Sequence, residues 1–321
     1  MYRAINLRAL VLLLVINFSF ASIYTGDAKP KKQPPKGNPV LWRKPADISS
    51  RDLYLGPGGA AMQPDLRQLT FIKEEKGGYS RKFRVRDASG QEWVAKIGKE
   101  AQSETAAIRL LWALGYATEV NYLVPRVTIP GKGTFNNVRF EARPSSWERL
   151  EEWKWKKNPF VGSAELQGLK IMMALMNNWD MKDSNNQIVY IEDGKKDLQY
   201  IISDLGATFG HASTTPLFWR ITRSRNNPTK YAKTKFLETV KGDRVKLHYG
   251  GKNKGLFKNI TVQDAEWLAA LLAQLNDSQI RDAFRAANYT PGQINLLTSA
   301  VRTRSNELLN LRPNTRISRN R

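Results

Sequence analysis

The stretch from residue 166 to residue 206 constrains the fold more narrowly than any other part of the chain. Apolar residues recur three or four positions apart over residues 166–176, which predicts a helix with one buried face. Residues 187–191 and 198–202 are typical of two strands joined by a turn. Because such a hairpin returns the chain to its starting point, we expect Asp204, just beyond the second strand, to lie close to Asn185, just before the first.

The polar loop between this helix and this hairpin carries residues that point to chemistry. It runs Asn-Trp-Asp-Met-Lys-Asp-Ser-Asn-Asn over residues 178–186, and Asp204-Leu-Gly follows nineteen residues beyond Asn185. Asn185 and Asp204 would offer two oxygen donors to a metal ion, and Mg²⁺ takes one or two carboxylates and completes its shell with phosphate oxygens and water. Asp180 would then be free to orient or deprotonate a hydroxyl group.

Three further strands are predicted upstream. They cover residues 69–73, 81–86 and 92–97. The third strand carries Val-Ala-Lys with Lys96 near its end, and Gly77 and Gly78 in the first turn would let backbone amides approach an anion. A helix is expected over residues 104–114, with Glu104 on the same face as the apolar residues. A carboxylate on an inward face needs a partner, and Lys96 is the natural one.

These elements and their order resemble the protein-kinase-like fold over roughly residues 67–210. The resemblance rests on Lys96, Glu104, the stretch from Asp180 to Asn185 and Asp204-Leu-Gly. It is a likeness of motifs and their order, and it is nearest to HipA-type kinases, type II phosphatidylinositol kinases and secretory-pathway kinases. It implies an α+β fold with two lobes, a small antiparallel-sheet lobe with one helix and a larger, mainly helical lobe.

The same resemblance implies roles for individual residues. Lys96, steadied by Glu104, would bind ATP or another nucleotide together with the turn at Gly77 and Gly78. Mg²⁺ or Mn²⁺ would be held by Asn185 and Asp204. The catalytic residues would be Asp180 as base or hydroxyl orienter, Lys182 as a contact to the transferred phosphate, and Asn185. Residues 142–144 would form the hinge between the lobes, where backbone groups meet the edge of an adenine.

The chain departs from the ordinary kinase pattern in four places. Trp179 stands where most kinases have an Arg after a His, and Leu205 replaces the Phe of Asp-Phe-Gly. The sequence contains no G-x-G-x-x-G loop and no Ala-Pro-Glu after Asp204. These departures argue against a conventional protein kinase and leave a related phosphotransferase or a catalytically dead kinase fold.

Each of these residues also has a purely structural interpretation when taken singly. Lys96 would lie over apolar surface with its amine in water. Asp180 and Asn185 would cap a helix end and a turn, and Glu104 would be a first-turn acid that favours the helix dipole. Their joint order on the expected elements favours the functional interpretation.

The scarcity of cysteine and histidine excludes several classes of site. The chain has no cysteine, which excludes disulfides, thiolate zinc sites and cysteine nucleophiles. His211 and His248 are its two histidines, and they fit neither a paired metal spacing nor a nucleophile elbow. Chemistry must therefore rest on carboxylates, amides, lysines and any bound metal.

The N-terminal residues predict export. Arg3 and Arg8 precede an apolar run that begins at Ala9 and is followed by a small-x-small site at residues 19–21, which is typical of a signal peptide over residues 1–21. An uncleaved anchor is the alternative, and no later segment is predicted to span a membrane. We therefore expect a secreted or periplasmic protein. The further divisions are a Pro/Lys-rich linker over 22–52, an N-lobe over 53–144, a C-lobe over 145–311 and a basic disordered tail over 312–321.

Positive charge indicates anionic partners. The chain carries a formal net charge of +22 at pH 7, and residues 211–260 hold twelve Lys or Arg against two acids. This excess favours an anionic acceptor or surface polymer, while the sequence contains no nucleic-acid-binding motif. We expect a phosphotransferase that moves a phosphoryl group from a nucleotide to a hydroxyl. A nucleotidyl transferase and a dead kinase-fold module that binds anionic polymers or headgroups are the alternatives.

Overall fold

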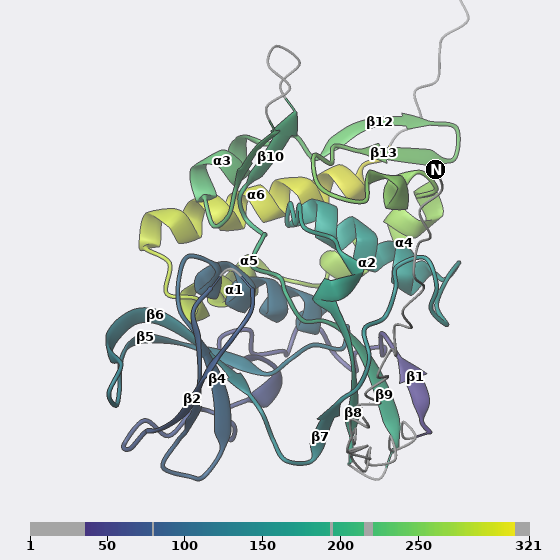
Figure 1. The fold of residues 1–321 in the computed structure, drawn as a ribbon. Coiled ribbons are helices and arrows are strands. Elements are labelled where there is room, and N and C mark those ends of the chain that lie inside the picture. The colour runs from purple at the N-terminus through teal and green to yellow at the C-terminus, as the bar shows by residue number, and fades with distance from the viewer. Residues whose placement is uncertain (1–35, 79, 193–194, 215–220, 312–321) are drawn as a thin grey trace, which may run out of the picture. The chain divides into compact units, whose positions relative to one another are not determined.

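The computed structural model describes residues 36–311 except residues 79, 193–194 and 215–220, and this part of the chain forms a mixed α+β fold with mainly antiparallel sheets (Figure 1). Residues from Lys36 onward form one compact unit. The predicted signal peptide and the predicted basic tail lie outside the described residues. No helix in the described part of the chain combines the length and apolar character needed to cross a bilayer.

The strands predicted upstream form a five-stranded antiparallel sheet with the order β2-β3-β4-β6-β5 (Figure 1). Its strands are β2 (Thr70–Glu75), β3 (Lys82–Arg86), β4 (Glu92–Lys96), β5 (Asn121–Ile129) and β6 (Gly133–Ala142). Gly77 and Gly78 lie between β2 and β3 at φ of +95° and +76°, values that glycine adopts without the penalty of a side chain.

The two faces of this sheet differ in chemistry because successive side chains along a strand point to opposite faces. One face is buried and apolar, and it carries Phe83, Val85, Trp93, Ala95, Val138 and Phe140. The alternate positions of the same strands form what we call the charged face, which carries Lys82, Arg84, Val94, Lys96, Arg139 and Glu141. Strand register places Lys96 opposite both Lys82 and Arg139. The sheet therefore buries hydrocarbon on one side and gathers charge on the other.

Helix α1 (Glu100–Ala113) follows β4 and is buried along most of its length. It contacts β5 and β6 on one side and helix α5 (Asp277–Ala286) on another. The helix begins four residues before the predicted start at residue 104, so Glu100 and Glu104 lie one turn apart on it. Two carboxylates, rather than the one predicted, are thereby placed near the end of β4.

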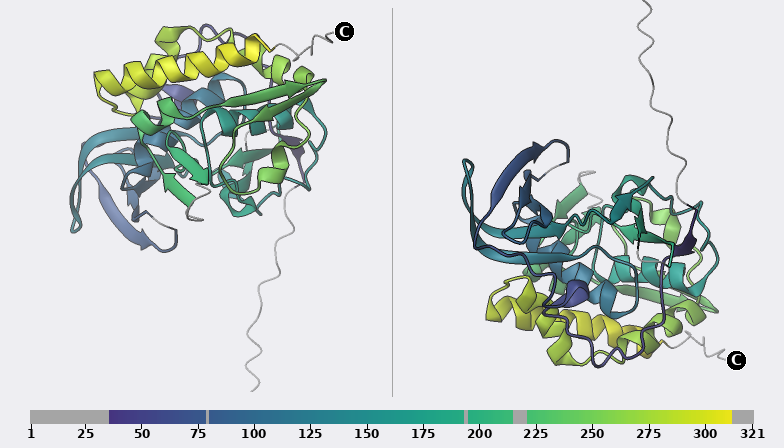
Figure 2. Two further views of the ribbon diagram at one scale, coloured as in Figure 1. Left: turned by 90° about the horizontal axis from the view of Figure 1, so that it is seen from above. Right: turned by 90° about the horizontal axis from the view of Figure 1, so that it is seen from below.

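The remaining helices are α2 (Ala164–Leu175), α3 (Pro228–Lys233), α4 (Val262–Leu272) and α6 (Pro291–Leu309). Capping boxes begin α4, α5 and α6, with Thr261, Asn276 and Thr290 as the N-cap residues. Figure 2 shows α6, in yellow, running alongside its neighbours, and it contacts α3, α4 and α5. Amphipathic periodicity over residues 265–275, 278–287 and 292–311 predicts the last three helices, and the structure places each within three residues of those bounds.

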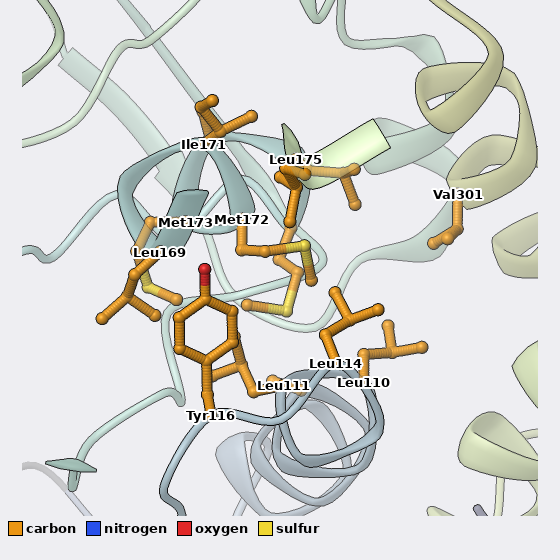
Figure 3. Close-up of a cluster of buried hydrophobic side chains, with 14 of the residues drawn as sticks. Leu110, Leu111, Leu114, Tyr116, Leu169, Ile171, Met172, Met173, Leu175 and Val301 are labelled. Atoms are coloured by element: carbon orange, nitrogen blue, oxygen red, sulfur yellow. The ribbon is translucent and has the colours of Figure 1, made fainter. Parts of the chain in front are cut away.

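A shared apolar core joins α1 to α2 (Figure 3). Its labelled members from α1 and the turn after it are Leu110, Leu111, Leu114 and Tyr116, and those from α2 include Leu169, Met172, Met173 and Leu175. Large buried side chains of this kind contribute about 2–5 kcal/mol each against truncation to Ala. This core fixes the polar loop that follows α2 relative to the carboxylates on α1.

A second sheet has the order β1-β9-β8-β7 and contains the predicted hairpin as β8 (Asn186–Ile191) and β9 (Asp197–Ile202). Strand β7 (Trp147–Arg149) pairs with β8, and β1 (Asn38–Val40) pairs with β9 in parallel. The predicted linker over residues 22–52 is therefore wrong for its second half. Leu41 and Ile48 are buried in the core. The free energy gained by burying these apolar side chains is enough to order the segment despite its Pro and Lys content.

The basic segment predicted over residues 211–260 contains regular structure that the sequence pattern did not indicate. It forms the hairpins β10–β11 (His211–Thr214 and Ile221–Ser224) and β12–β13 (Leu237–Lys241 and Arg244–Leu247), with helix α3 between them. Short 3₁₀ helices occur at Gly56–Gly58, Asp183–Asn185 and Lys254–Phe257. Strands of four or five residues hold too few alternating positions to be recognised from the sequence pattern alone.

Replacing Leu41 tests whether residues 36–52 belong to the fold. Leu41→Ala should lower the free energy of unfolding by about 2–5 kcal/mol, because the side chain is 1% exposed and its removal leaves a cavity. Leu66→Ala is the matched control, since Leu66 is 40% exposed and should cost less than about 0.5 kcal/mol. Urea denaturation measures both values. Equal, small losses would contradict the packing of this segment.

Candidate active site

A cavity of about 410 Å³ lies against the charged face of the five-stranded sheet. Lys96 from β4, Asn185 from the loop after α2, and Asp204 from the end of β9 all line it. The structure thus brings together three predicted site residues, although the first and the last are more than a hundred positions apart in the sequence. We refer to this space as the Lys96 cavity.

The Lys96 ammonium lies among three carboxylates. Its Nζ is 3.0 Å from both Glu104 and Glu100 and 3.6 Å from Oδ1 of Asp204. Burial alone would lower the pKa of Lys96, but the negative charges of Glu104 and Asp204 raise it above its ordinary value. Lys96 therefore stays protonated and presents a fixed positive charge to the cavity.

Glu104 and Glu100 hold this lysine from helix α1, and each also has a second partner. Glu104 Oε2 is 3.2 Å from Nε of Arg139, so this carboxylate is shared by two cations. Glu100 accepts a hydrogen bond from Ser80 at 2.7 Å and pairs with Arg225 at 2.8 Å. The predicted partnership of Lys96 and Glu104 is present, and the sequence reasoning missed Glu100.

Gly206 explains why the turn after β9 can lie against helix α1. A Cβ atom at Gly206 would meet the Glu100 side chain at 2.7 Å, closer than real Cβ contacts. The Ser103 hydroxyl donates to the Gly206 carbonyl at 3.1 Å. The Gly of Asp204-Leu-Gly is therefore required for the close approach that carries Asp204 to Lys96.

The hairpin brings Asp204 back to Asn185 as predicted. The carbonyl oxygen of Asn185 accepts from the N–H of Ser203 at 2.8 Å and from that of Asp204 at 3.3 Å. The Asn185 side chain donates through Nδ2 to the backbone carbonyl of Asp180 at 2.6 Å. The backbone of Asn185 thus contacts the end of the hairpin, and its side chain contacts the start of the polar loop.

Asp180 lies beside the Lys96 cavity without lining it. Its carboxylate contacts the Nζ of Lys252 at 2.6 Å and that of Lys182 at 3.1 Å. Burial opposes its ionisation, but hydrogen bonds from Lys252 and Lys182 outweigh burial and lower the pKa of Asp180. The carboxylate is charged at neutral pH and is a hydrogen-bond acceptor. Lys252 comes from a part of the chain that the sequence motifs did not single out.

Trp179 has a packing role that accounts for its place in the motif. The side chain is buried, and its Nε1 donates to the carbonyl of Ser224 at 3.1 Å. The guanidinium groups of Arg223 and Arg225 lie 5.0 Å and 4.9 Å from its ring centroid. The indole therefore joins the loop to strand β11, where the ordinary kinase motif has a charged residue.

Asn185 and Asp204 have the donor chemistry for Mg²⁺ or Mn²⁺. Burial would raise the pKa of Asp204, but Lys96 and the Gly206 N–H lower it, so the carboxylate is ionised. The described residues include no group of three His, Cys, Asp or Glu side chains that could hold a metal by themselves. One carboxylate and one amide, completed by phosphate oxygens and water, match the way Mg²⁺ binds with a phosphate ligand.

A set of buried and half-buried charges, most of which line the cavity, was not predicted. We call it the charge network, and its members are Glu119, Arg139, Glu141, Arg143 and Arg149. Arg139 reaches Glu141 at 2.7 Å, and Arg149 reaches Glu119 at 2.9 Å. Burial opposes the charge on Glu141, yet Arg143, Arg139 and Arg149 hold the pKa of this carboxyl well below its ordinary value. Charges at alternate positions of residues 138–142 were the sequence signal for it.

The remaining predicted residues lie outside the lining of the Lys96 cavity. Gly77 and Gly78 form the turn between β2 and β3, and a Cβ at Gly77 would meet nothing within 4 Å. The positive φ angles of both residues explain why glycine is needed there. Neither residue lines the Lys96 cavity. Lys182 is engaged with Asp180 rather than with the cavity.

A second cavity of about 630 Å³ lies over the β12–β13 hairpin. Its floor includes Val245, Leu247, Tyr249 and Phe257, and its rim carries Lys241, Arg244, Lys246, Lys254 and Lys258. The same segment reaches the polar loop after α2, because Asn253 donates to the Met181 carbonyl at 2.5 Å and Lys252 contacts Asp180. A basic, partly apolar surface therefore adjoins Asp180.

Replacing Glu141 tests the charge network through its pH dependence. Glu141→Gln should lower the free energy of unfolding at pH 7 by about 3–5 kcal/mol, because buried arginines lose a partner. The folded-state pKa of Glu141 is lowered from 4.5, so its stabilisation is present above that pH and is lost as the pH falls through the folded-state pKa. The difference in the free energy of unfolding between wild type and variant, measured by urea denaturation, should therefore become smaller as the pH is lowered. Glu148→Gln, at an exposed position on β7, is the control, and a difference that stays constant with pH would contradict the network.

Comparison with known proteins finds similarity among solved structures. No model of a known protein family matches the chain, and no curated protein matches its sequence. Among solved structures, the crystal structure of the Helicobacter pylori proinflammatory kinase CtkA is similar with a TM-score of 0.46 and 11% sequence identity. The match covers 76% of this chain and 93% of that chain.

Proposed function

We propose that this protein is a phosphotransferase with a two-lobed, protein-kinase-like fold, which moves a phosphoryl group to a hydroxyl acceptor. The observation that carries the proposal is the position of the Lys96 ammonium, 3.0 Å from Glu104 and 3.6 Å from Asp204 at one cavity. In this proposal the five-stranded sheet with α1 is the small lobe, and the other helices with the second sheet belong to the large lobe.

The residues around the cavity divide the work of binding phosphate. Lys96 contacts the phosphate oxygens of the donor, and Glu104 and Glu100 fix its position from α1. Asn185 and Asp204 would hold Mg²⁺ or Mn²⁺, which would supply positive charge at the phosphates. Phosphoryl transfer needs little covalent participation by the protein, so positioned charges of this kind account for most of the catalysis.

Asp180 orients the acceptor. Its charged carboxylate accepts a hydrogen bond from the acceptor hydroxyl and receives the proton as the new bond forms. In this proposal Lys182 and Lys252, which contact this carboxylate, also balance charge on the transferred phosphate. A base with a lowered pKa is sufficient, because the loose transition state of phosphoryl transfer demands little deprotonation of the nucleophile.

The acceptor is anionic. The second cavity places five cationic side chains around an apolar floor beside the Asp180 loop, and this favours an acidic ligand with an apolar portion. ATP or another nucleotide is the donor implied by the kinase-like motifs, and other phosphoanhydrides contain the same reacting bond. Secretion or a periplasmic location, implied by the predicted signal peptide, is part of the same proposal.

Replacing the phosphate-binding residues should abolish transfer. Lys96→Met and Asp204→Asn should each lower the rate of terminal-phosphate release or transfer about 100-fold or more, because each removes a fixed charge at the phosphates. The assay follows phosphate-labelled donors in Mg²⁺ by mass spectrometry. Lys99→Met is the matched control, because Lys99 is exposed next to α1. Unchanged rates in both variants would end the proposal.

Replacing Asp180 separates the chemical step from donor binding. Asp180→Asn should lower kcat about 100-fold or more while the affinity for donor and Mg²⁺ stays nearly unchanged, because the side chain does not line the Lys96 cavity. Asp243→Asn, at a position whose side chain is 73% exposed, is the control. Equal losses of donor affinity and kcat would contradict the assignment to the acceptor.

A further inference from the structure

We propose that the phosphoryl donor of the Lys96 cavity is a condensed phosphate, a linear chain of phosphates without a nucleoside. This inference rests on the proposed phosphotransferase function and narrows its donor. Three independent features of the cavity carry it: the chemistry of its walls, the state of the predicted hinge and the distribution of its cations.

The walls of the cavity lack the apolar surface on which a base would stack. Val94 is the single apolar side chain that lines it in the described part of the chain. Neighbouring positions on the charged face hold Lys82, Arg84 and Glu141 instead. Sites for aromatic ligands are lined mainly by apolar side chains with a few polar groups, and this cavity has the opposite composition.

The predicted hinge has no backbone donor to offer to an adenine edge. The N–H of Ala142 donates to the Val120 carbonyl at 2.9 Å, and the N–H of Arg143 donates to the Glu92 carbonyl at 2.8 Å. Pro144 has no N–H. The backbone N–H groups of residues 142 and 143 are therefore already used within the protein, which disfavours the predicted contact of residues 142–144 with a nucleotide base.

Charged side chains also occupy the space between the hinge and Asp204. Arg149 Nη2 donates to the Ser203 hydroxyl at 2.7 Å, directly before Asp204 in the sequence, and Arg149 also pairs with Glu141 at 3.3 Å. Arg143 pairs with Glu141 from the hinge. A planar base in this position would have to displace paired charges from one another, whereas a phosphate would add hydrogen bonds to the arginines.

The cations of the cavity are spread along its wall. Seven cationic side chains and three carboxylates line it in the described residues, and Glu100, Glu104 and Glu119 pair with Lys96, Arg139 and Arg149 from outside the lining, which leaves an excess of one positive charge. The cations extend from Lys96 and Lys82 to Arg143 and Arg149, so they are not confined to the site of one phosphate. A condensed phosphate carries about one negative charge per phosphate along its whole length, and it satisfies this distribution where a nucleoside would not.

The reaction balances with this donor alone. The acceptor oxygen attacks the terminal phosphorus, and the bond from that phosphorus to the bridging oxygen breaks. The bridging oxygen keeps the electron pair and leaves with a chain one phosphate shorter. The acceptor proton passes to the Asp180 carboxylate and then to water.

Calorimetric titration of the full chain in Mg²⁺ tests the donor class. Tripolyphosphate should bind at least as tightly as ATP, longer chains more tightly, and adenosine not at all, because the base makes no favourable contact. ATP binding more tightly than tripolyphosphate would overturn the inference. Inositol hexakisphosphate has dense phosphates but no phosphoanhydride bond, and its binding tenfold more tightly than tripolyphosphate would also overturn it.

Variants on the charged face test where the phosphates bind. Arg84→Gln and Lys82→Gln should each weaken tripolyphosphate binding about tenfold, since each removes a cation from the cavity wall. Arg86→Gln is the matched control, because Arg86 lies on the same strand, pairs with Glu92 and does not line the cavity. Equal affinity in all three variants would place the ligand elsewhere.

Phosphate-transfer assays separate failure of this inference from failure of the proposed function. The shortening of labelled polyphosphate and of ATP is followed in parallel, with Asp204→Asn as the inactive reference. Consumption of ATP in preference to polyphosphate overturns the condensed-phosphate donor and leaves the phosphotransferase standing. Tight tripolyphosphate binding without transfer to any acceptor, including water, overturns the phosphotransferase and with it the donor role.

Discussion

The ion cluster around the Lys96 ammonium is the interaction on which the candidate site depends. It joins the end of β4, helix α1 through Glu100 and Glu104, and the turn after β9 through Asp204. Three segments that are distant in the sequence are thereby held at one point. A buried ammonium is tolerated only when carboxylates surround it, so the cluster also determines which side chains can approach the cavity. Gly206 completes the arrangement by permitting the turn to contact α1.

Apolar packing by the five-stranded sheet offsets the free-energy cost of burying this ion cluster. The apolar face of the sheet supplies the packing, which leaves the opposite face of the same strands available for charge. Carboxylates pair with most of the cations on that face, and phosphate oxygens would add hydrogen bonds to them. The same charged, largely non-apolar lining is the basis of both the proposed function and the proposed donor. The basic cavity beside Asp180 continues this preference for anions toward the acceptor.

Sequence periodicity predicted the elements that assemble the site but not the charges between them. The β8–β9 hairpin required Asp204 to return to Asn185, and the Asp204 nitrogen lies 3.3 Å from the Asn185 carbonyl oxygen. The charge network was missed because its members come from three separate segments, residues 119, 139–143 and 149, whose contacts a local sequence pattern does not specify. Residues 36–52 were misjudged because their Pro and Lys content concealed Leu41 and Ile48, which are buried.

The most direct measurement is a crystal structure of the protein with Mg²⁺ and a non-hydrolysable triphosphate analogue. The account predicts phosphate density in the Lys96 cavity, with Lys96 on a phosphate oxygen, the metal ion on Asn185 and Asp204, and no base stacked at residues 142–144. Phosphates bound at another surface, with Lys96 still enclosed by its carboxylates alone, would contradict it.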